Sequence, residues 1–183
     1  MEAARERVYR VARRTPLVKL DPALPMPAYY SSVDVHQHPG GVWSDDLAGF
    51  VYEEGARSTT PAMGAKHADL HQRFTDLIVA EGKPKRVLDM GCGFGKSTRP
   101  FYRDLPEAEV TAVDLAAPCL NVAGVQAAQD QARNVRFLQK SAYETGLPDK
   151  SFDLVTSTMV LHEMPPEKIE ATMAEAARLL APG

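Results

Sequence analysis

The chain has 183 residues, of which 44% are hydrophobic and 25% are charged, and its formal net charge is −3. This length suits one domain with a sizeable core, and the weak negative charge gives no general attraction to nucleic acid or to an anionic membrane. No apolar run approaches the ~20 residues that cross a bilayer, so we expect no membrane span. The start of the sequence does not resemble a signal peptide, and two cysteines are too few for a disulfide framework, so we expect a reduced, cytoplasmic protein.

Residues 1–61 are predicted to form an N-terminal extension or lid. A short basic helix is expected within residues 2–14, whose alternating charges are typical of a solvent-exposed face. Between Thr15 and Pro61, repeated prolines together with Gly40 and Gly41 favour irregular structure rather than a sheet. The same stretch contains five aromatic residues, which is too many for a free linker. We therefore expect it to pack on the main domain, over the ligand site.

Two pairs of histidines precede the main motifs. His36 and His38 are two residues apart in an extended stretch, and His67 and His71 have helical i, i+4 spacing. No cluster of cysteines or carboxylates completes a tetrahedral set around either pair, and the second pair lacks the glutamate that a zinc protease uses as its base. Polar loop or pocket histidines are therefore expected, and no native metal site.

Residues 61–81 have the periodicity of a helix. Leu70, Phe74, Leu77 and Ile78 fall at positions i, i+4, i+7 and i+8, which predicts a stripe that faces the core. Gly82 follows and favours the end of the helix there.

Residues 86–98, RVLDMGCGFGKST, form the most informative stretch of the sequence. A short apolar strand ends at Asp89, and Gly91, Gly93 and Gly95 then leave room for a ligand to approach the main chain. A helix beginning near Ser97 directs its free N–H groups back at this loop. The GxGxG spacing differs from the GxGxxG of a dinucleotide-binding fold and from a phosphate-binding P-loop. An ordinary tight turn between a strand and a helix is the alternative.

The next strand, residues 110–114, ends in Asp114, which lies 25 residues after Asp89. A carboxylate at that position can accept hydrogen bonds from both ribose hydroxyls of a nucleoside. The alternative is that it caps the helix that begins near residue 117, but in combination with the glycine loop the nucleoside role is favoured.

Strands and helices continue to alternate to the end of the sequence. A helix is expected over residues 118–132, strands over 135–138 and 152–159, and a helix over 166–180. This alternation predicts an α/β fold with a parallel sheet and right-handed crossovers. Ligands bind at the carboxyl ends of such strands, where Asp89, the glycines, Asp114, Ser141 and residues 158–163 are expected to lie.

Four motifs in this order resemble those of the class I S-adenosylmethionine-dependent methyltransferases, especially the small-molecule branch. They read VLDMGCGFGKST, VTAVDLA, NVRFLQKSAYETGLPDKSFDLVTSTMVLHEMP and EAARLLAPG, and the resemblance covers roughly residues 62–183. It implies a Rossmann-like parallel sheet of strand order 3-2-1-4 with flanking helices. It also implies S-adenosyl-L-methionine as the cofactor and a small molecule as the methyl acceptor.

The resemblance also implies roles for individual residues. Asp89, Gly91, Cys92 and Gly93, in one loop with Gly95, surround the methionine part of the cofactor, Asp114 holds the ribose and Leu115 packs against the adenine. Thr158 ends the strand that faces the methyl group. Ser141 and Ala142 stand beside the adenine amino group, where the family often has Asp-Ala, so that serine leaves one charged acceptor fewer.

His162 is the candidate catalytic base if the acceptor has to lose a proton, because imidazole titrates near physiological pH. The alternative is that it braces the loop before the two prolines at 165 and 166. Glu163, Tyr29, Tyr30 and His38 are weaker candidates that would line the pocket.

Family members continue beyond a segment like LLAPG into strands 5 to 7, which this chain, ending at Gly183, is expected to lack. We therefore predict one of two situations. Either the chain is a fragment of a longer enzyme, or its edge strand at residues 152–159 is covered, by the N-terminal segment or by another chain such as a second copy. The favoured function is methyl transfer to a small organic acceptor. The alternative is a non-catalytic nucleoside-binding or interaction module that pairs through that strand. The sequence identifies neither the acceptor nor the atom that is methylated.

Overall fold

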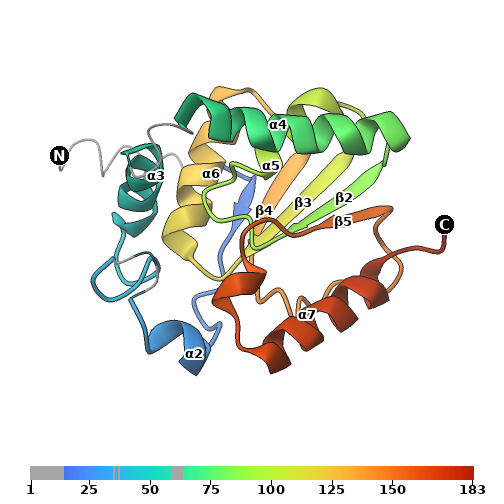
Figure 1. Cartoon of the computed structure of the whole chain (residues 1–183). Helices are drawn as coiled ribbons and strands as arrows, with labels where there is room; N and C mark the ends of the chain where they lie inside the picture. Colours follow the sequence, from blue (N-terminus) through green and yellow to red (C-terminus); the bar gives the residue numbers. More distant parts are fainter. Residues whose placement is uncertain (1–14, 35, 37, 59–63) are drawn as a thin grey trace.

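The computed structural model describes residues 15–34, 36, 38–58 and 64–183, so the helix expected within residues 2–14 lies outside the described part. The described chain is built on a parallel five-stranded sheet of order β1-β4-β3-β2-β5 (Figure 1). The strands are β1 (Val18–Lys19), β2 (Arg86–Met90), β3 (Glu109–Asp114), β4 (Val135–Gln139) and β5 (Leu154–Thr156). The predicted order 3-2-1-4 is confirmed as β4-β3-β2-β5, with β1 added outside β4.

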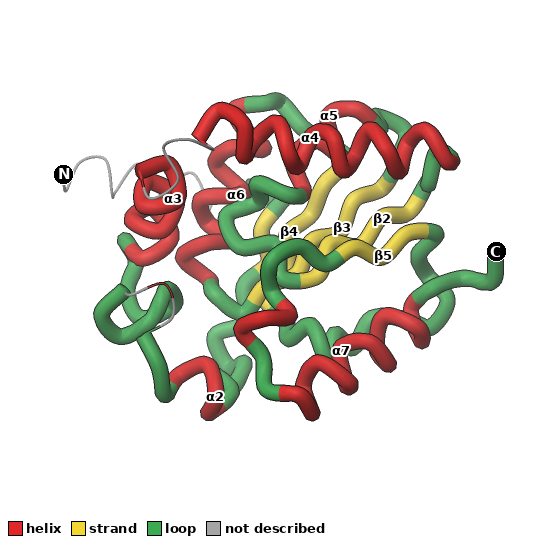
Figure 2. Tube along the Cα trace, viewed as in Figure 1, coloured by secondary structure: helices red, strands yellow, loops and turns green. Residues whose placement is uncertain are grey.

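Helices cover both faces of the sheet, as expected for an α/β fold. The helices are α2 (Ala28–Ser31), α3 (Ala48–Ser58), α4 (Gly64–Glu81), α5 (Thr98–Asp104), α6 (Ala117–Gln129) and α7 (Pro166–Leu179), and a 3-10 turn spans Leu161–Glu163. Figures 1 and 2 show α4, α5 and α6 over one face of the sheet and α7 over the other. None of the described helices is both long and apolar enough to cross a membrane.

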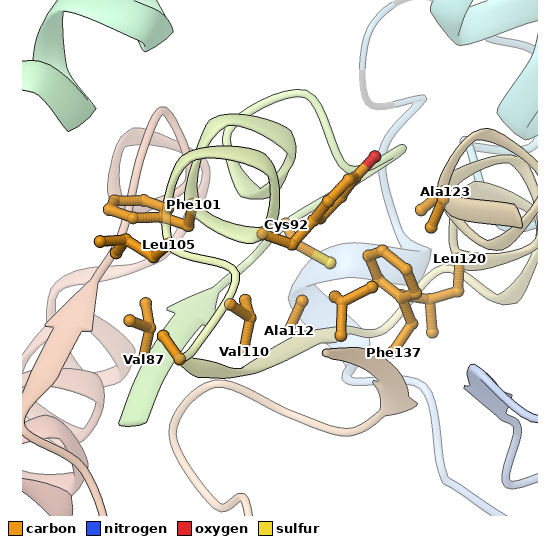
Figure 3. Close-up of a cluster of buried hydrophobic side chains, with 13 residues drawn as sticks. Val87, Cys92, Phe101, Leu105, Val110, Ala112, Leu120, Ala123 and Phe137 are labelled. Atoms are coloured by element: carbon orange, nitrogen blue, oxygen red, sulfur yellow. The ribbon is translucent and has the colours of Figure 1, made fainter. Parts of the chain in front are cut away.

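Strand β2 lies between two apolar layers, which explains its continuous apolar run. Val87 belongs to the cluster beneath α5 and α6, where it joins Phe101 and Phe137 (Figure 3). Leu88 points to the opposite face, into a cluster that contains Leu179 of α7. A strand buried on both faces has no polar side to alternate with. Each such side chain contributes about 1.5–3 kcal/mol by leaving water.

The segment between residues 15 and 58 is more regular than its prolines predict. Val18 lies opposite Phe137 in a parallel pairing of β1 with β4, and the N–H of Phe137 donates a hydrogen bond of 2.6 Å to the carbonyl of Leu17. The expectation that this segment contributes nothing to a sheet was therefore wrong. A two-residue strand is too short to produce a recognisable alternation of apolar and polar residues in the sequence. Only its pairing with β4 defines it.

Two glycines let the N-terminal segment pack closely on α6. A Cβ atom on Gly49 of α3 would lie 2.3 Å from the carbonyl oxygen of Pro118, and one on Gly124 of α6 would lie 2.3 Å from a methyl carbon of Val18. Real Cβ atoms essentially never come this close, so any side chain at either position would push the segment away. The segment therefore packs directly on the main domain, from both α3 and β1.

The predicted core stripe of α4 was wrong for three of its four residues. The side chains of Leu70, Phe74 and Leu77 are 53%, 42% and 70% exposed. The helix instead buries Thr75 and packs Ile78 and Val79 against the core cluster. Periodicity identifies a helix, but the contacts with neighbouring helices decide which of two overlapping stripes faces inward.

Strand β5 is shorter than predicted and ends at Thr156. Phe152 forms only an isolated bridge with Leu180, and Met159 has a left-handed backbone with φ 61°. The chain therefore leaves the sheet before Met159, so Thr158 lies in the loop that follows the strand.

Candidate cofactor site

The glycine loop makes a tight turn where β2 ends. The N–H groups of Gly91 and Cys92 both donate to the carbonyl of Val113 on β3, at 2.8 and 3.1 Å. Gly91 has φ 76°, which side chains rarely adopt, and a Cβ atom there would lie 2.6 Å from a methyl carbon of Val160. Glycine at position 91 is thus required both by the backbone angle and by the loop that packs over it.

Asp89 lies beneath the glycine loop and holds it in place. Its side chain is fully buried and accepts hydrogen bonds from the hydroxyls of Ser97 at 2.7 Å, Thr98 at 2.6 Å and Thr156 at 3.2 Å. Burial raises the pKa of Asp89, and the three hydroxyl groups act in the opposite direction. Asp89 therefore ties β2 to the start of α5 and to β5, and it does not line the cavity described below.

Asp114, at the end of β3, braces the other side of the loop. One carboxylate oxygen accepts the N–H of Gly93 at 2.8 Å, and the other accepts the N–H of Ala116 at 2.8 Å. Burial raises the pKa of Asp114 to about 6, and the negative charges of Glu163 and Asp89 act in the same direction. The carboxylate thus connects the two neighbouring strand ends at which a nucleoside is expected.

A cavity of about 560 Å³ opens at these strand ends. Its volume lies within the range of about 300–1,000 Å³ that is usual for small-molecule sites. The predicted site residues that line it are Gly91, Cys92, Gly93, Asp114, Thr158 and His162. The N-terminal segment supplies a second wall, which includes Tyr30, His36, His38 and Tyr52.

Four other predicted cofactor residues lie outside the lining of this cavity. A Cβ atom on Gly95 would lie 2.8 Å from that of Ala123, so this glycine serves packing against α6. Leu115 is buried in a cluster with Tyr30 and Val42 of the N-terminal segment. Ser141 and Ala142 are both buried, and their contact with adenine stays a prediction.

Cys92 lines the cavity, but its thiol belongs to the core. Figure 3 shows the sulfur pointing into the buried cluster that includes Ala112 and Phe137. Burial raises the pKa of this thiol well above its usual value, and the nearby Asp114 carboxylate adds to the effect. The main chain of Cys92 is therefore the part suited to a ligand, and the thiol is unreactive.

The sequence did not indicate the most closely connected group in the wall. His36 stacks on Tyr52 with ring centroids 4.2 Å apart, and its Nε2 lies 2.7 Å from a carboxylate oxygen of Glu163. Tyr52 in turn meets the ring of Phe94 edge-on at 5.1 Å. Only the fold brings these residues together, because His36 and Glu163 lie near opposite ends of the chain.

The remaining histidines are placed as follows. His162 has a side chain that is 58% exposed, and its Nε2 lies 3.8 Å from Glu163. His38 lies 3.3 Å from Asp45, and His71 is buried and lines the cavity. The side chain of His67 lies outside the described residues. Within the described part of the chain, no group of three or more His, Cys, Asp or Glu residues is arranged to hold a metal ion.

Residues 87–183 match the family model described as a methyltransferase domain. The chain belongs to this methyltransferase family. Its motifs and fold are those of a class I S-adenosylmethionine-dependent methyltransferase, as the sequence predicted.

Known proteins similar to this methyltransferase chain include a demethylmenaquinone methyltransferase of Thermus thermophilus. It is 36% identical over 118 residues, which cover 63% of this chain and 52% of the relative. A structure of a candidate O-methyltransferase from Nostoc punctiforme is 26% identical with a TM-score of 0.60, covering 74% of this chain and 38% of the other. A structure from Methanococcus maripaludis, at 14% identity and a TM-score of 0.63, covers 76% of this chain and 60% of the other and shares the fold.

The methyltransferase chain matches only part of each curated relative. The matched region spans between 24% and 52% of the relatives' own lengths.

Proposed function

We propose that this chain binds S-adenosylmethionine in the cavity and catalyses transfer of its methyl group to a small organic acceptor. The observation that carries the proposal is the convergence of the glycine loop and the Asp114 carboxylate on one cavity of about 560 Å³. Gly91 and Gly93 would hold the methionine part and Asp114 the ribose, with Thr158 near the methyl group.

The residues present fit this cofactor. A Cβ atom on Gly93 would meet only Tyr52, at 3.9 Å, so the missing side chain leaves space in the cavity beside the main chain. Each carboxylate oxygen of Asp114 accepts one hydrogen bond from a backbone N–H. A carboxylate oxygen has a further lone pair, which can accept a hydrogen bond from a ribose hydroxyl. When bound, S-adenosylmethionine supplies a methyl group that its positive sulfur makes electrophilic. The chain's own contribution is to hold the reactants in line and exclude water.

The N-terminal segment is proposed to act as a lid over the adenine end of the site. Tyr30 and Val42 pack against Leu115, where the family resemblance places the adenine ring. On this proposal, these two side chains move aside when an adenine ring contacts Leu115, so cofactor entry is coupled to displacement of the segment.

Calorimetric titration with S-adenosylhomocysteine tests the proposal. We expect saturable binding to the parent chain and a loss of affinity of at least about tenfold in Asp114→Ala, because a charge-assisted hydrogen bond is removed. Asp104→Ala is the matched control, since it removes an exposed carboxylate at the end of α5. Absence of binding to a chain that unfolds cooperatively, or equal affinities for all three proteins, would contradict the proposal.

A second candidate function rests on the edge of the sheet. Among the described residues, β5 pairs only with β2, which leaves its other edge open to a strand from a second copy of the chain. Light scattering measures this directly, and a monomer at all accessible concentrations contradicts it.

Both cysteines are free thiols, which supports the proposal that the chain works in the reducing cytoplasm.

A further inference from the structure

The contact between His36 and Glu163 joins two walls of the cavity. His36 comes from the segment between α2 and α3, and Glu163 comes from the 3-10 turn after β5. Nε2 of His36 lies 2.7 Å from the Glu163 carboxylate, and the two side chains are 34% and 18% exposed. Both residues line the cavity, and His36 is also open to solvent, so a ligand can reach the pair.

Three independent constraints fix the imidazole of His36. Its backbone has φ 57°, a left-handed conformation that is uncommon for a residue with a side chain. Its ring stacks on Tyr52 at 4.2 Å with an interplanar angle of 29°, and its Nε2 contacts Glu163. Local backbone strain held by such surroundings is concentrated at functional sites.

The carboxylate also determines which nitrogen of His36 can accept a proton. An ionised carboxylate can only accept a proton contact, so its position 2.7 Å from Nε2 favours the neutral form of His36 that carries its proton on Nε2. In a neutral imidazole the other nitrogen, Nδ1, is then the unprotonated one. A base oriented by a third group in this way is the arrangement that activates nucleophiles in many enzymes.

The pair lies beside the part of the site proposed to hold the methyl donor. His36 stacks on Tyr52, and a Cβ atom on Gly93 would lie 3.9 Å from the same Tyr52 ring. Gly93 and Asp114 are the residues proposed to hold the cofactor, and the rings of Tyr52 and Phe94 next to His36 suit a flat aromatic acceptor. A proton acceptor is required there only if the acceptor atom carries a proton that must leave.

We propose that His36, oriented by Glu163, is the catalytic base that removes the proton from an aromatic hydroxyl as it is methylated. This inference rests on the proposed function. In the step, the hydroxyl oxygen forms a bond to the methyl carbon, the bond between that carbon and sulfur breaks with its electrons going to sulfur, and the hydroxyl proton moves to Nδ1 of His36. The products are an aryl methyl ether, neutral S-adenosylhomocysteine and an imidazolium that faces the Glu163 carboxylate.

Other titratable groups face the same space. Glu163 and His162 come from the turn after β5, Asp114 from β3 and Tyr52 from α3, and Tyr30 and Cys119 line the cavity from α2 and α6. Burial raises the pKa of Tyr52 and of Cys119, so neither competes as a base. The other histidines that line the cavity are His38, His71 and His162. His71 is buried, Nε2 of His38 lies 3.3 Å from Asp45, and Nε2 of His162 lies 3.8 Å from Glu163 on a side chain that is 58% exposed, so the contact of His36 with Glu163 is the closer one.

Two phenols that differ only in acidity separate a base from a structural residue. In mildly alkaline buffer 4-nitrophenol is largely ionised, whereas phenol, with a pKa near ~10, keeps its proton. We expect His36→Gln to slow methylation of phenol about 100-fold or more, because phenol must lose its proton in the reaction. Methylation of 4-nitrophenol, which has already lost its proton, should slow by less than about tenfold. Equal losses on both phenols, or a phenol-selective loss in His162→Gln in place of His36→Gln, would overturn the assignment.

Nitrogen NMR of the histidine side chains gives a readout that needs no turnover. The His36 signals are identified by their absence from the spectrum of His36→Gln. We expect the Nε2–H form in the parent chain and a mixture of both neutral forms in Glu163→Gln, because the carboxylate selects the form. A parent chain in which His36 carries its proton on Nδ1 would overturn the inference.

Titration with S-adenosylhomocysteine separates this inference from the proposed function. If the ligand binds and neither phenol is methylated, the base assignment fails while cofactor binding stands. If the ligand does not bind to the folded chain, the proposed function fails and the inference falls with it.

Discussion

Asp114 is the residue at which stability and ligand binding conflict. Burial raises its pKa to about 6, compared with about 3.9 in an unfolded chain. Between these two values the folded state binds more protons than the unfolded state, so the contribution of Asp114 to stability is largest below about pH 4 and is lost as the pH rises through about 6. At neutral pH Asp114 is therefore ionised although its burial makes the ionised form costly for fold stability. A ligand that binds the ionised carboxylate would explain why an acidic residue stands at this position.

The affinity for S-adenosylhomocysteine is expected to fall as the pH drops below about 6. Hydroxyl donors favour the ionised carboxylate, and protonation of Asp114 in the free chain competes with the ligand, by up to about tenfold per pH unit. Calorimetric titrations from about pH 8 to about pH 5 measure this. The Asp114→Asn variant should bind S-adenosylhomocysteine more weakly, and its affinity should depend less on pH near pH 6. If the pH dependence of the affinity is unchanged in this variant, the protonation that weakens binding belongs to another group.

Gly91 offers a test of the close packing over the loop. Gly91→Ala places a Cβ atom 2.6 Å from a methyl carbon of Val160 at a backbone with φ 76°, and should lower the free energy of unfolding by roughly 2–4 kcal/mol. Gly93→Ala is the matched control, because it carries the same kind of backbone strain but meets only Tyr52 at 3.9 Å. Denaturant unfolding compares the two, and equal losses would contradict the role given to Val160.

Among the helices, α4 shows how far a pattern can mislead. Leu77 and Ile78 are neighbours in the sequence and both belong to the predicted stripe, yet Leu77 is 70% exposed while Ile78 packs on the core cluster. Leu77→Ser should therefore change the free energy of unfolding by less than about 0.5 kcal/mol, and Ile78→Ser should cost about 2 kcal/mol or more. Denaturant unfolding measures both. A costly Leu77→Ser would mean that this face is covered in solution.

Elements with local signals were predicted, and elements defined by distant contacts were not. The glycine loop and the strand that ends at Asp114 follow from residues close together in the sequence, which is why the cavity-lining Gly91, Gly93 and Asp114 could be anticipated. The order of the four strands was implied by the resemblance to the methyltransferases. The two-residue strand β1 exists through pairing with β4. The contact of His36 with Glu163 likewise exists only through the fold.

In the molecule as a whole, the N-terminal segment and the sheet share one site. Tyr30 and Val42 of the N-terminal segment share a buried cluster with Leu115. Saturating S-adenosylhomocysteine should therefore change amide hydrogen exchange in residues 24–43 as well as in the glycine loop, while exchange in the base of the sheet near Arg86 and Asp153 rises or falls only with global stability. If only the glycine loop responds, the segment is not a lid.

The two close contacts of α6 have a consequence for recombining this protein with its relatives. Gly124 receives Val18, and Gly49 receives the backbone at Pro118, so the segment and α6 form a matched pair that leaves no room for a Cβ atom at either glycine. A chimera that takes the N-terminal segment from this chain and the remainder from a homologue inherits a steric clash wherever that homologue has a larger residue at the position of Gly124. The unit of exchange is therefore the segment together with α6, and libraries that shuffle acceptor walls should place their crossover after Gln129.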